Sequence, residues 1–177
     1  MPRSTGATLE TRERAPNPRA SRAATRKRAE VGIRTLSYTD LPHVIAIERR
    51  SFPAPWSLAM FVLELSKPAS VCIGAFDDGQ LVGYLICSRY HTVWHLMNVA
   101  VDPDHRRSGI ASSLIEYLFR VTGESERYTL EVRVSNADAI RMYESFGFHS
   151  AGVRLRYYHD NNEDALIMWR TDGPDTD

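Results

Sequence analysis

Residues 99–112 read VAVDPDHRRSGIAS, and this stretch decides the fold of the chain. The apolar segment Val93–Val101 ends at Asp102-Pro103 and has the composition of a strand. A polar segment then leads to Gly109, after which apolar residues repeat at helical spacing as far as Gly123, a residue typical of helix ends. The stretch is therefore predicted to be a strand, a polar turn and a helix at the centre of a mixed α/β domain.

The chain on either side of this unit alternates between strand-like and helix-like segments. A hairpin is expected at Asp77-Asp78-Gly79-Gln80, and helix caps are expected at Thr39 or Asp40 and at Ser57. The expected order is β-α-α-β-β-β-α-β-α-β-β. The strands are predicted at Val31–Ser37, Ser70–Phe76, Leu81–Ser88, Val93–Val101, Tyr128–Val134, Phe148–Val153 and Ala165–Trp169, and the later helices at 110–122 and Asn136–Ser145.

Length and composition favour one compact cytoplasmic domain. The chain has 177 residues, of which 43% are hydrophobic and 25% are charged. Its longest apolar run, Leu81–Cys87, is far shorter than the ~18 residues of a membrane-spanning helix, and no apolar segment follows the basic N-terminal stretch as in a secretory signal. Cys72 and Cys87 lack metal-site or redox-motif spacing, so both are predicted to be buried, inert thiols in a reducing compartment.

The net charge of zero conceals an uneven distribution. Residues 1–30 hold eight Arg or Lys and three Glu, a net +5, so the remainder carries −5. We predict a disordered basic tail over residues 1–30, a single domain over 31–170 and a flexible tail over 171–177. The basic tail suits a nonspecific contact with RNA or the ribosome, but a merely solvated tail or a start codon placed too early is the favoured explanation.

The turn before Gly109 has the features of a phosphate site. The first turn of a helix presents unpaired N–H groups and the positive end of the helix dipole. Gly109 and Ala111 allow a ligand to approach the backbone, and Arg106 and Arg107 add positive charge. A solvated basic turn before an ordinary helix would have the same sequence.

Further motifs place this turn in a family context. The R-x-x-G-x-A pattern at 106–111 resembles the acetyl-CoA signature of the GNAT N-acetyltransferase superfamily. LEVRVSN at 130–136, AIRMYESFGF at 139–148, RYY at 156–158 and EDALIM at 163–168 follow in the order that this family uses. The set is similar to the bacterial RimI-type subgroup, the ribosomal-protein alanine N-acetyltransferases, over about residues 31–169.

The resemblance implies a GNAT fold, with a mostly antiparallel central sheet flanked by helices, and acetyl-CoA as the co-substrate. It implies that backbone groups of Val99–Val101 bind the pantetheine arm and that Arg107–Ser112 bind the pyrophosphate. It also implies that Asn136 binds an amide of the arm. Asn136 would serve equally well as a helix N-cap. The cofactor-binding residues implied are Val99, Ala100, Val101, Arg106, Arg107, Ser108, Gly109, Ile110, Ala111, Ser112 and Asn136.

The same resemblance implies Glu131 as general base and Tyr143 as general acid. Alternation along the strand puts Glu131 on a polar face, which is also what a half-exposed strand would show. Tyr143 lies at helical spacing from Ile140, as a core tyrosine would. No acyl-cysteine intermediate is expected. His91 and His95 are four residues apart, but on a strand and without a third ligand, so no metal site is predicted.

The acceptor is expected to bind between Trp56 and the tyrosines Tyr157 and Tyr158 of a loop over residues 157–164. Asp160, Glu163 and Asp164 make this loop acidic and favour a basic peptide. The subgroup implies the N-terminal alanine of small-subunit ribosomal protein eighteen as acceptor. The alternatives are a GNAT enzyme acting on lysine side chains or a small amine, and a non-catalytic module that senses acyl-CoA and contacts RNA through its tail.

Overall fold

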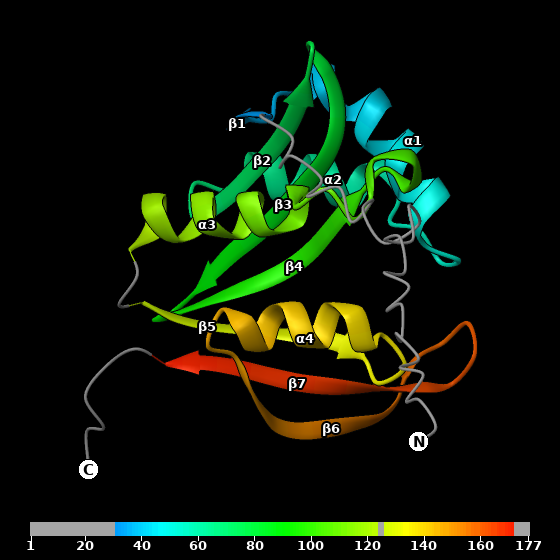
Figure 1. Ribbon diagram of the computed structural model, residues 1–177, viewed down its shortest axis with the longest axis vertical. Coiled ribbons are helices and arrows are strands. Elements are labelled where there is room, and N and C mark those ends of the chain that lie inside the picture. The colour runs from blue at the N-terminus through cyan, green and yellow to red at the C-terminus, as the bar shows by residue number, and fades with distance from the viewer. Residues whose placement is uncertain (1–30, 124–125, 172–177) are drawn as a thin grey trace, which may run out of the picture.

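The computed structural model describes residues 31–123 and 126–171, whose strands form one seven-stranded sheet in the order β1-β2-β3-β4-β5-β7-β6 (Figure 1). The predicted order of strands and helices is confirmed. The elements are β1 Gly32–Thr35, α1 Leu41–Ser51, α2 Leu58–Ser66, β2 Ser70–Asp77, β3 Gln80–Tyr90, β4 Val93–Val101, α3 Ile110–Thr122, β5 Arg127–Arg133, α4 Ala137–Ser145, β6 His149–Tyr158 and β7 Glu163–Thr171. The expected tail at 1–30 and residues 172–177 of the expected C-terminal tail lie outside the described residues.

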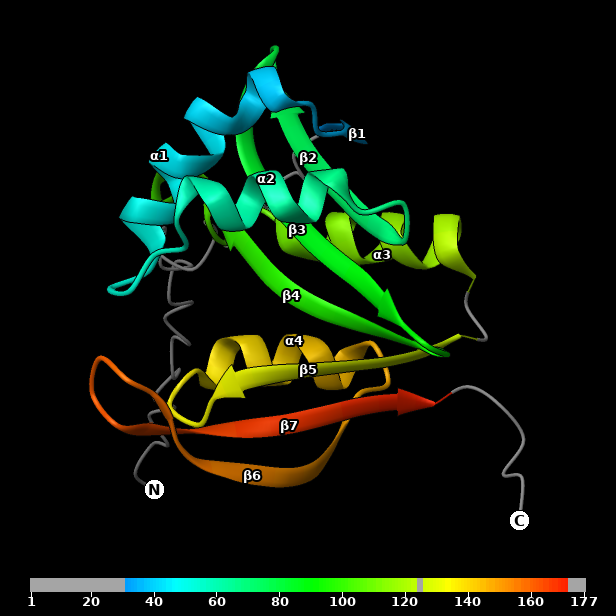
Figure 2. The same cartoon turned by 180° about the vertical axis from the view of Figure 1, so that it is seen from behind.

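Helices cover both faces of the sheet and enclose a core on each side. Helices α1 and α2 lie on one face and α3 and α4 on the other, as Figures 1 and 2 show from opposite sides. Val44 and Phe61 are fully buried in the first core, and Leu114 and Leu118 in the second. Burying each such side chain contributes about 1.5–3 kcal/mol. Among the described residues, no helix is long and apolar enough to cross a membrane.

The two cysteines lie in different cores. Cys72 packs beneath α1 and α2, whereas Cys87 packs beneath α3, and both are free thiols. Burial raises the pKa of Cys72 to about 12 and also raises the pKa of Cys87. The prediction of buried thiols without a disulfide is confirmed, and neither sulfur is activated as a nucleophile.

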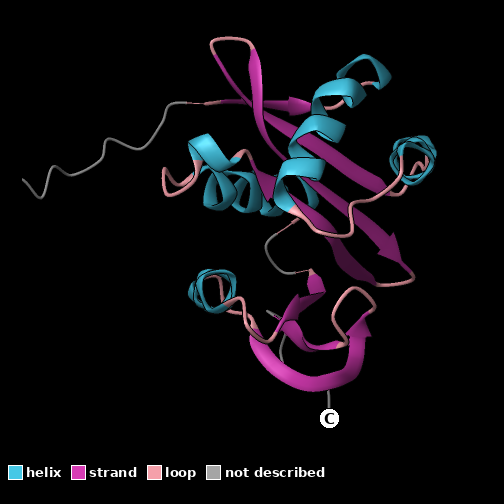
Figure 3. Ribbon diagram, turned by 90° about the vertical axis from the view of Figure 1, so that its right-hand side faces the viewer, coloured by secondary structure: helices cyan, strands magenta, loops and turns pink. Residues whose placement is uncertain are grey.

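The central strands β4 and β5 separate along their length. They pair in parallel from Val93 opposite Arg127 to Leu96 opposite Leu130, and no further pair between them follows in the described residues. A bulge at Met97 bends β4 at the point where this pairing stops, while the rest of β4 stays on β3 as far as Val101. The two strands therefore diverge and leave a gap between them, which Figures 1 and 3 show from two directions.

The hairpin of β6 and β7 is longer than the sequence predicts. A loop was expected from Tyr157 to Asp164, but β6 extends to Tyr158 and β7 begins at Glu163. The pairing of the two strands is irregular at Gly152 and between Arg154 and Tyr158, and Arg156 has a φ of 52°. These irregularities destroy the period-two pattern by which a strand is identified.

The first helix also begins differently from the prediction. Asp40 is its N-cap residue, but the Asp40 carboxylate makes no capping bond to α1. It instead accepts hydrogen bonds from Ser37 N at 2.8 Å and from both terminal nitrogens of Arg34 at 2.8 Å. Asp40 thus ties β1 to the start of α1, and with Ser37 it forms a capping box on the short 3₁₀ helix Tyr38–Asp40 that precedes α1.

Candidate active site

A cleft of about 1070 Å³ opens between the diverging halves of β4 and β5. Sites for small molecules typically measure about 300–1,000 Å³, so this cleft can hold a long ligand together with part of a second one. Every site residue predicted from the sequence lines it, except Ser108. These lining residues are Trp56, Val99, Ala100, Val101, Arg106, Arg107, Gly109, Ile110, Ala111, Ser112, Glu131, Asn136, Tyr143, Tyr157 and Tyr158.

The start of α3 forms one end of the cleft. Its N-cap is Gly109, whose φ of 83° lies in the left-handed region that glycine adopts without strain. Glycine has no side chain with which to cap a helix, and the first turn contains no acidic residue. The N–H groups of residues 110–112 are therefore suited to an anionic ligand. Ser108 does not line the cleft, because its hydroxyl donates to the carbonyl of His105 inside the turn.

The two arginines of this turn are held by different partners. Arg106 Nε donates to the carbonyl of Val101 at 3.2 Å, which fixes its side chain against the end of β4. Arg107 reaches Asp138 of α4 at 3.2 Å, and both of these side chains are largely exposed. Such an exposed pair contributes little to stability, so Arg107 can exchange its partner for a phosphate at low cost.

The second half of β4 offers a free edge to the cleft. Val99 and Val101 are paired with β3 on one side, and on the other side the pairing with β5 has already ended. An extended ligand can hydrogen-bond to such an edge as an added strand would. Asn136 faces the same space, and its Oδ1 caps α4 by accepting from Ala139 N at 3.2 Å. A contact to a ligand carbonyl would use Nδ2, so the two roles proposed for Asn136 are compatible.

Glu131 lies at the other end of the gap, on β5. The predicted alternation is observed, because Leu130 and Val132 are buried in the core while Glu131 faces the cleft. Its side chain is only 8% exposed and contacts His95 Nε2 at 2.6 Å and Arg154 at 3.3 Å. The hydrogen bond to His95, with a further contribution from the charge of Arg154, lowers the pKa of Glu131 despite its partial burial.

His95 was missed as a candidate for the reaction. Its spacing from His91 suggests only a metal ligand, and in the described residues no group of three or more His, Cys, Asp or Glu side chains is placed to hold a metal ion. Parallel pairing puts His95 opposite Thr129, beside Glu131 on the adjoining strand. The polar residue within an apolar strand was the available signal, but its partner is 36 residues away in sequence.

Tyr143 is a buried residue of α4 at the edge of the cleft. Its ring packs edge-on against Phe148 at a centroid distance of 5.7 Å, so it has the core role that helical spacing suggested. It also lines the cleft. Burial, together with the nearby Tyr158, raises the pKa of Tyr143, which keeps its hydroxyl protonated at neutral pH.

Two further segments line the cleft. One joins α1 to α2 and ends at Trp56, whose ring contacts Phe61 at 5.3 Å. The other is the end of β6, where Tyr157 and Tyr158 pack edge-on at 5.2 Å. The structure thus brings the predicted acceptor residues to the cleft, with the tyrosines on a strand end rather than in a loop.

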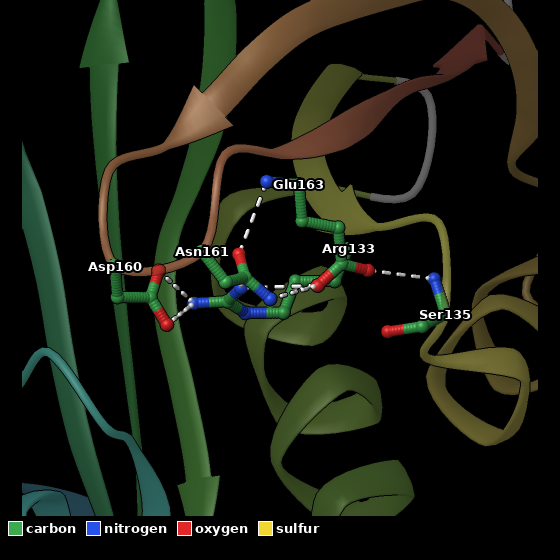
Figure 4. Close-up of polar contacts among 5 residues, drawn as sticks. All are labelled: Arg133, Ser135, Asp160, Asn161 and Glu163. Atoms are coloured by element: carbon green, nitrogen blue, oxygen red, sulfur yellow. Dashed lines mark hydrogen bonds and ion pairs between the residues drawn. The ribbon is translucent and has the colours of Figure 1, made fainter.

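Arg133 holds the β6–β7 turn in place, as Figure 4 shows. Its guanidinium contacts Asp160 at 2.8 Å and Glu163 at 3.0 Å, and lies over the ring of Tyr158 at 3.9 Å. Glu163 also accepts from Ser135 N at 2.9 Å. Much of the acidity predicted for this loop is therefore paired internally, which weakens the argument that it attracts a basic peptide.

Comparisons with known proteins agree with this geometry. Residues 41–148 match the acetyltransferase (GNAT) family model. An Escherichia coli K12 protein named ribosomal protein bS18-alanine N-acetyltransferase is 37% identical over 140 residues, which cover 77% of this chain and 94% of the relative. A Sulfurisphaera tokodaii protein named N-alpha-acetyltransferase is 32% identical over 161 residues, covering 82% and 96%. The crystal structure of the ribosomal-protein-S18-alanine N-acetyltransferase from E. coli superposes with a TM-score of 0.74 at 34% identity, covering 82% of this chain and 97% of that one.

Proposed function

The chain belongs to the acetyltransferase (GNAT) family and is an acetyl-CoA-dependent acetyltransferase, and on this premise we propose that it acetylates the N-terminal α-amino group of a protein. We propose the N-terminal alanine of ribosomal protein bS18 as the acceptor, because the name of the E. coli relative specifies this protein and this residue type. The observation that carries the proposal is that one cleft joins an anion-binding helix terminus, at α3, to the recessed carboxylate of Glu131.

In this proposal the donor binds along β4 and the start of α3. The N–H groups of residues 110–112 hold its diphosphate, with Arg106 and Arg107 as charged neighbours. The free edge of Val99–Val101 and the amide of Asn136 bind its arm. Acetyl-CoA supplies a thioester as the activated acyl group.

Glu131 acts as the general base, directly or through water or His95. An α-amino group has a pKa near 8, so removing its proton at pH 7 costs about 1.4 kcal/mol, whereas a lysine at about 10.4 would cost about 4.6 kcal/mol. Because His95 lowers the pKa of Glu131, this carboxylate is a weaker base than an ordinary glutamate. It is therefore better matched to an N-terminal amine than to a lysine side chain.

The transfer needs no covalent enzyme intermediate. The amine nitrogen bonds to the acetyl carbonyl carbon, the carbon–sulfur bond breaks, and sulfur leaves with the electron pair. Glu131 accepts the proton from the amine, and Tyr143 supplies one to the departing thiolate. A thiolate with a pKa of about 8.5 requires little help from a proton donor, so the contribution of Tyr143 is the smaller of the two.

Acceptor selection is tested with matched peptides. Three peptides would share all residues after the first and present an N-terminal alanine, an N-terminal serine, or a blocked N-terminus with one lysine. Release of free thiol should be fastest with alanine and slowest with the blocked peptide. Equal or faster turnover of the blocked peptide would overturn the proposal in favour of lysine acetylation, and coenzyme A binding without turnover of any amine would favour the sensing module.

We also propose a cytoplasmic location. A ribosomal protein is available to a modifying enzyme in the compartment where ribosomes are built, and two free, buried cysteines suit a reducing environment.

A further inference from the structure

Glu48 is a buried carboxylate that the proposed chemistry does not use. It lies in α1, near the end of that helix, and only 1% of its surface is exposed. Burying a charge costs free energy unless the charge is fully hydrogen-bonded, so the hydrogen-bond partners of Glu48 indicate its structural role.

Three donors from three elements converge on this carboxylate. Trp56 N donates to Oε1 at 2.7 Å, and the Tyr84 hydroxyl of β3 donates to Oε2. Asn98 Nδ2 of β4 lies 3.3 Å from Oε1 and 3.2 Å from Oε2. Burial and the Glu48 charge raise the pKa of Tyr84, so its hydroxyl remains a donor. A carboxylate is the one side-chain group that accepts from all three, because a glutamine would turn its own N–H₂ toward at least one of them.

The same residue holds both ends of the segment Phe52–Trp56. The backbone carbonyl of Glu48 accepts from Phe52 N at 3.0 Å, and the side chain accepts from Trp56 N. Between them, Pro53 and Pro55 have no N–H to donate, so the segment has few backbone groups of its own for anchoring. Phe52, Pro53, Ala54 and Trp56 all line the cleft.

The third partner, Asn98, lies on the donor strand β4. Asn98 follows the bulge at Met97, where β4 leaves β5 and its free edge begins. We propose that Glu48 is a positioning residue that sets the spacing between the acceptor wall, Phe52–Trp56, and the donor strand β4. The inference rests on the proposed function, since it assigns these two walls to the two substrates.

The test compares Glu48→Gln with Tyr84→Phe. Tyr84 donates to the same carboxylate but does not line the cleft. Tyr84→Phe therefore measures how much stability and peptide binding change when the buried cluster alone is disturbed. Glu48→Gln should raise the KM for an alanine-terminated peptide at least ten-fold and change the KM for acetyl-CoA less than two-fold. Tyr84→Phe should lower the melting temperature and leave the peptide KM within two-fold.

A double variant provides the rescue. In Glu48→Gln with Asn98→Asp, the glutamine can still accept from Trp56 N and donate to the new aspartate, so the peptide KM should return toward the wild-type value. A merely structural role predicts instead that Glu48→Gln raises both KM values alike, or that Tyr84→Phe reproduces the loss. Either result would overturn the inference.

Hydrogen exchange keeps the inference testable without turnover. The Trp56 amide should be protected in the wild type and exchange at least ten-fold faster in Glu48→Gln, while amides of α3 are unchanged. An unprotected Trp56 amide in the wild type would contradict the inference whatever the activity. If no amine is turned over but Trp56 is protected as expected, the proposed function fails while the anchoring contact stands.

Discussion

Glu131 is fixed in position before any substrate binds. His95 and Arg154 contact its two oxygens at 2.6 and 3.3 Å, and only 8% of its side chain is exposed. Its lowered pKa keeps the carboxylate ionised at neutral pH, as the proposed role of general base requires. The drawback is low basicity, which an α-amine tolerates and a lysine does not.

Replacing Glu131 with glutamine should lower kcat by about 10²-fold or more, because an amide cannot accept the amine proton. Coenzyme A affinity should be unchanged, since Glu131 is on β5 and the proposed diphosphate site is at α3. Thiol release across pH and calorimetric titration with coenzyme A measure the two quantities. Tyr143→Phe is the comparison and should cost less, because the leaving thiolate scarcely needs a proton. Wild-type turnover of Glu131→Gln at every pH would remove Glu131 from the mechanism.

At the level of elements, the start of α3 depends on a backbone conformation as much as on side chains. Gly109, at a φ of 83°, turns the chain so that the helix begins with residues that line the cleft. Gly79 in the β2–β3 turn has nearly the same φ, 80°, and a Cβ there would meet nothing within 4 Å. The chain therefore contains a control for backbone strain alone.

Gly109→Val and Gly79→Val should each cost stability, on the order of 1–2 kcal/mol, because a β-branched residue is strained at positive φ. Only Gly109→Val should also weaken coenzyme A binding, by about ten-fold or more, since a valine side chain would crowd the proposed site of the phosphates. Thermal unfolding and coenzyme A titration of both variants separate the two effects. Equal affinities of the two variants would rule out the turn before α3 as the phosphate site.

The elements that the sequence predicts well are those with a clear local pattern. Asp78 and Gly79 both have positive φ, as the expected tight hairpin turn requires, and α3 ends at Gly123 as predicted. The end of β6 was misassigned because its bulges hide the alternation, and Arg156 has a positive φ that its residue type does not suggest.

Across the whole molecule, the unpredicted features are contacts between distant elements. Alternation along β5 places Glu131 on the polar face, but it does not reveal that β4 brings His95 beside it. From the sequence, Glu48 is an ordinary helix residue. Its importance becomes visible only in the structure, where β4 and the α1–α2 segment contact its carboxylate. The family motifs identify the cleft residues, and the three-dimensional sheet order then shows which of them meet.

Acid stability is also a property of the whole molecule, because carboxylates with lowered pKa values hold contacts in several separate parts of the fold. Asp40 bonds Arg34, Glu64 bonds Lys67, and the pKa of Glu163 is lowered to about 2 by its bonds to Ser135 and then Arg133. A carboxylate whose pKa is lower in the folded state stabilises the fold above its unfolded pKa, near 4, and loses that contribution as the pH falls. The urea midpoint should therefore be nearly constant between pH 8 and 5 and fall steeply below pH 4.

Asp40→Asn tests this explanation, because Asp40 is 9% exposed and its carboxylate is held by Arg34 and Ser37. At pH 7 the variant should lose about 1–2 kcal/mol of unfolding free energy, the amount typical of charge-assisted hydrogen bonds. At pH 3 the difference in unfolding free energy between wild type and variant should narrow, because this pH lies below the unfolded pKa of Asp40 but above its lowered folded pKa, so part of the benefit is lost. Urea unfolding at pH 7, 5 and 3 measures both, with Asp77→Asn, at an exposed position, as the control. If the difference in unfolding free energy between wild type and Asp40→Asn stays constant from pH 7 to pH 3, the contacts of Asp40 do not depend on its charge.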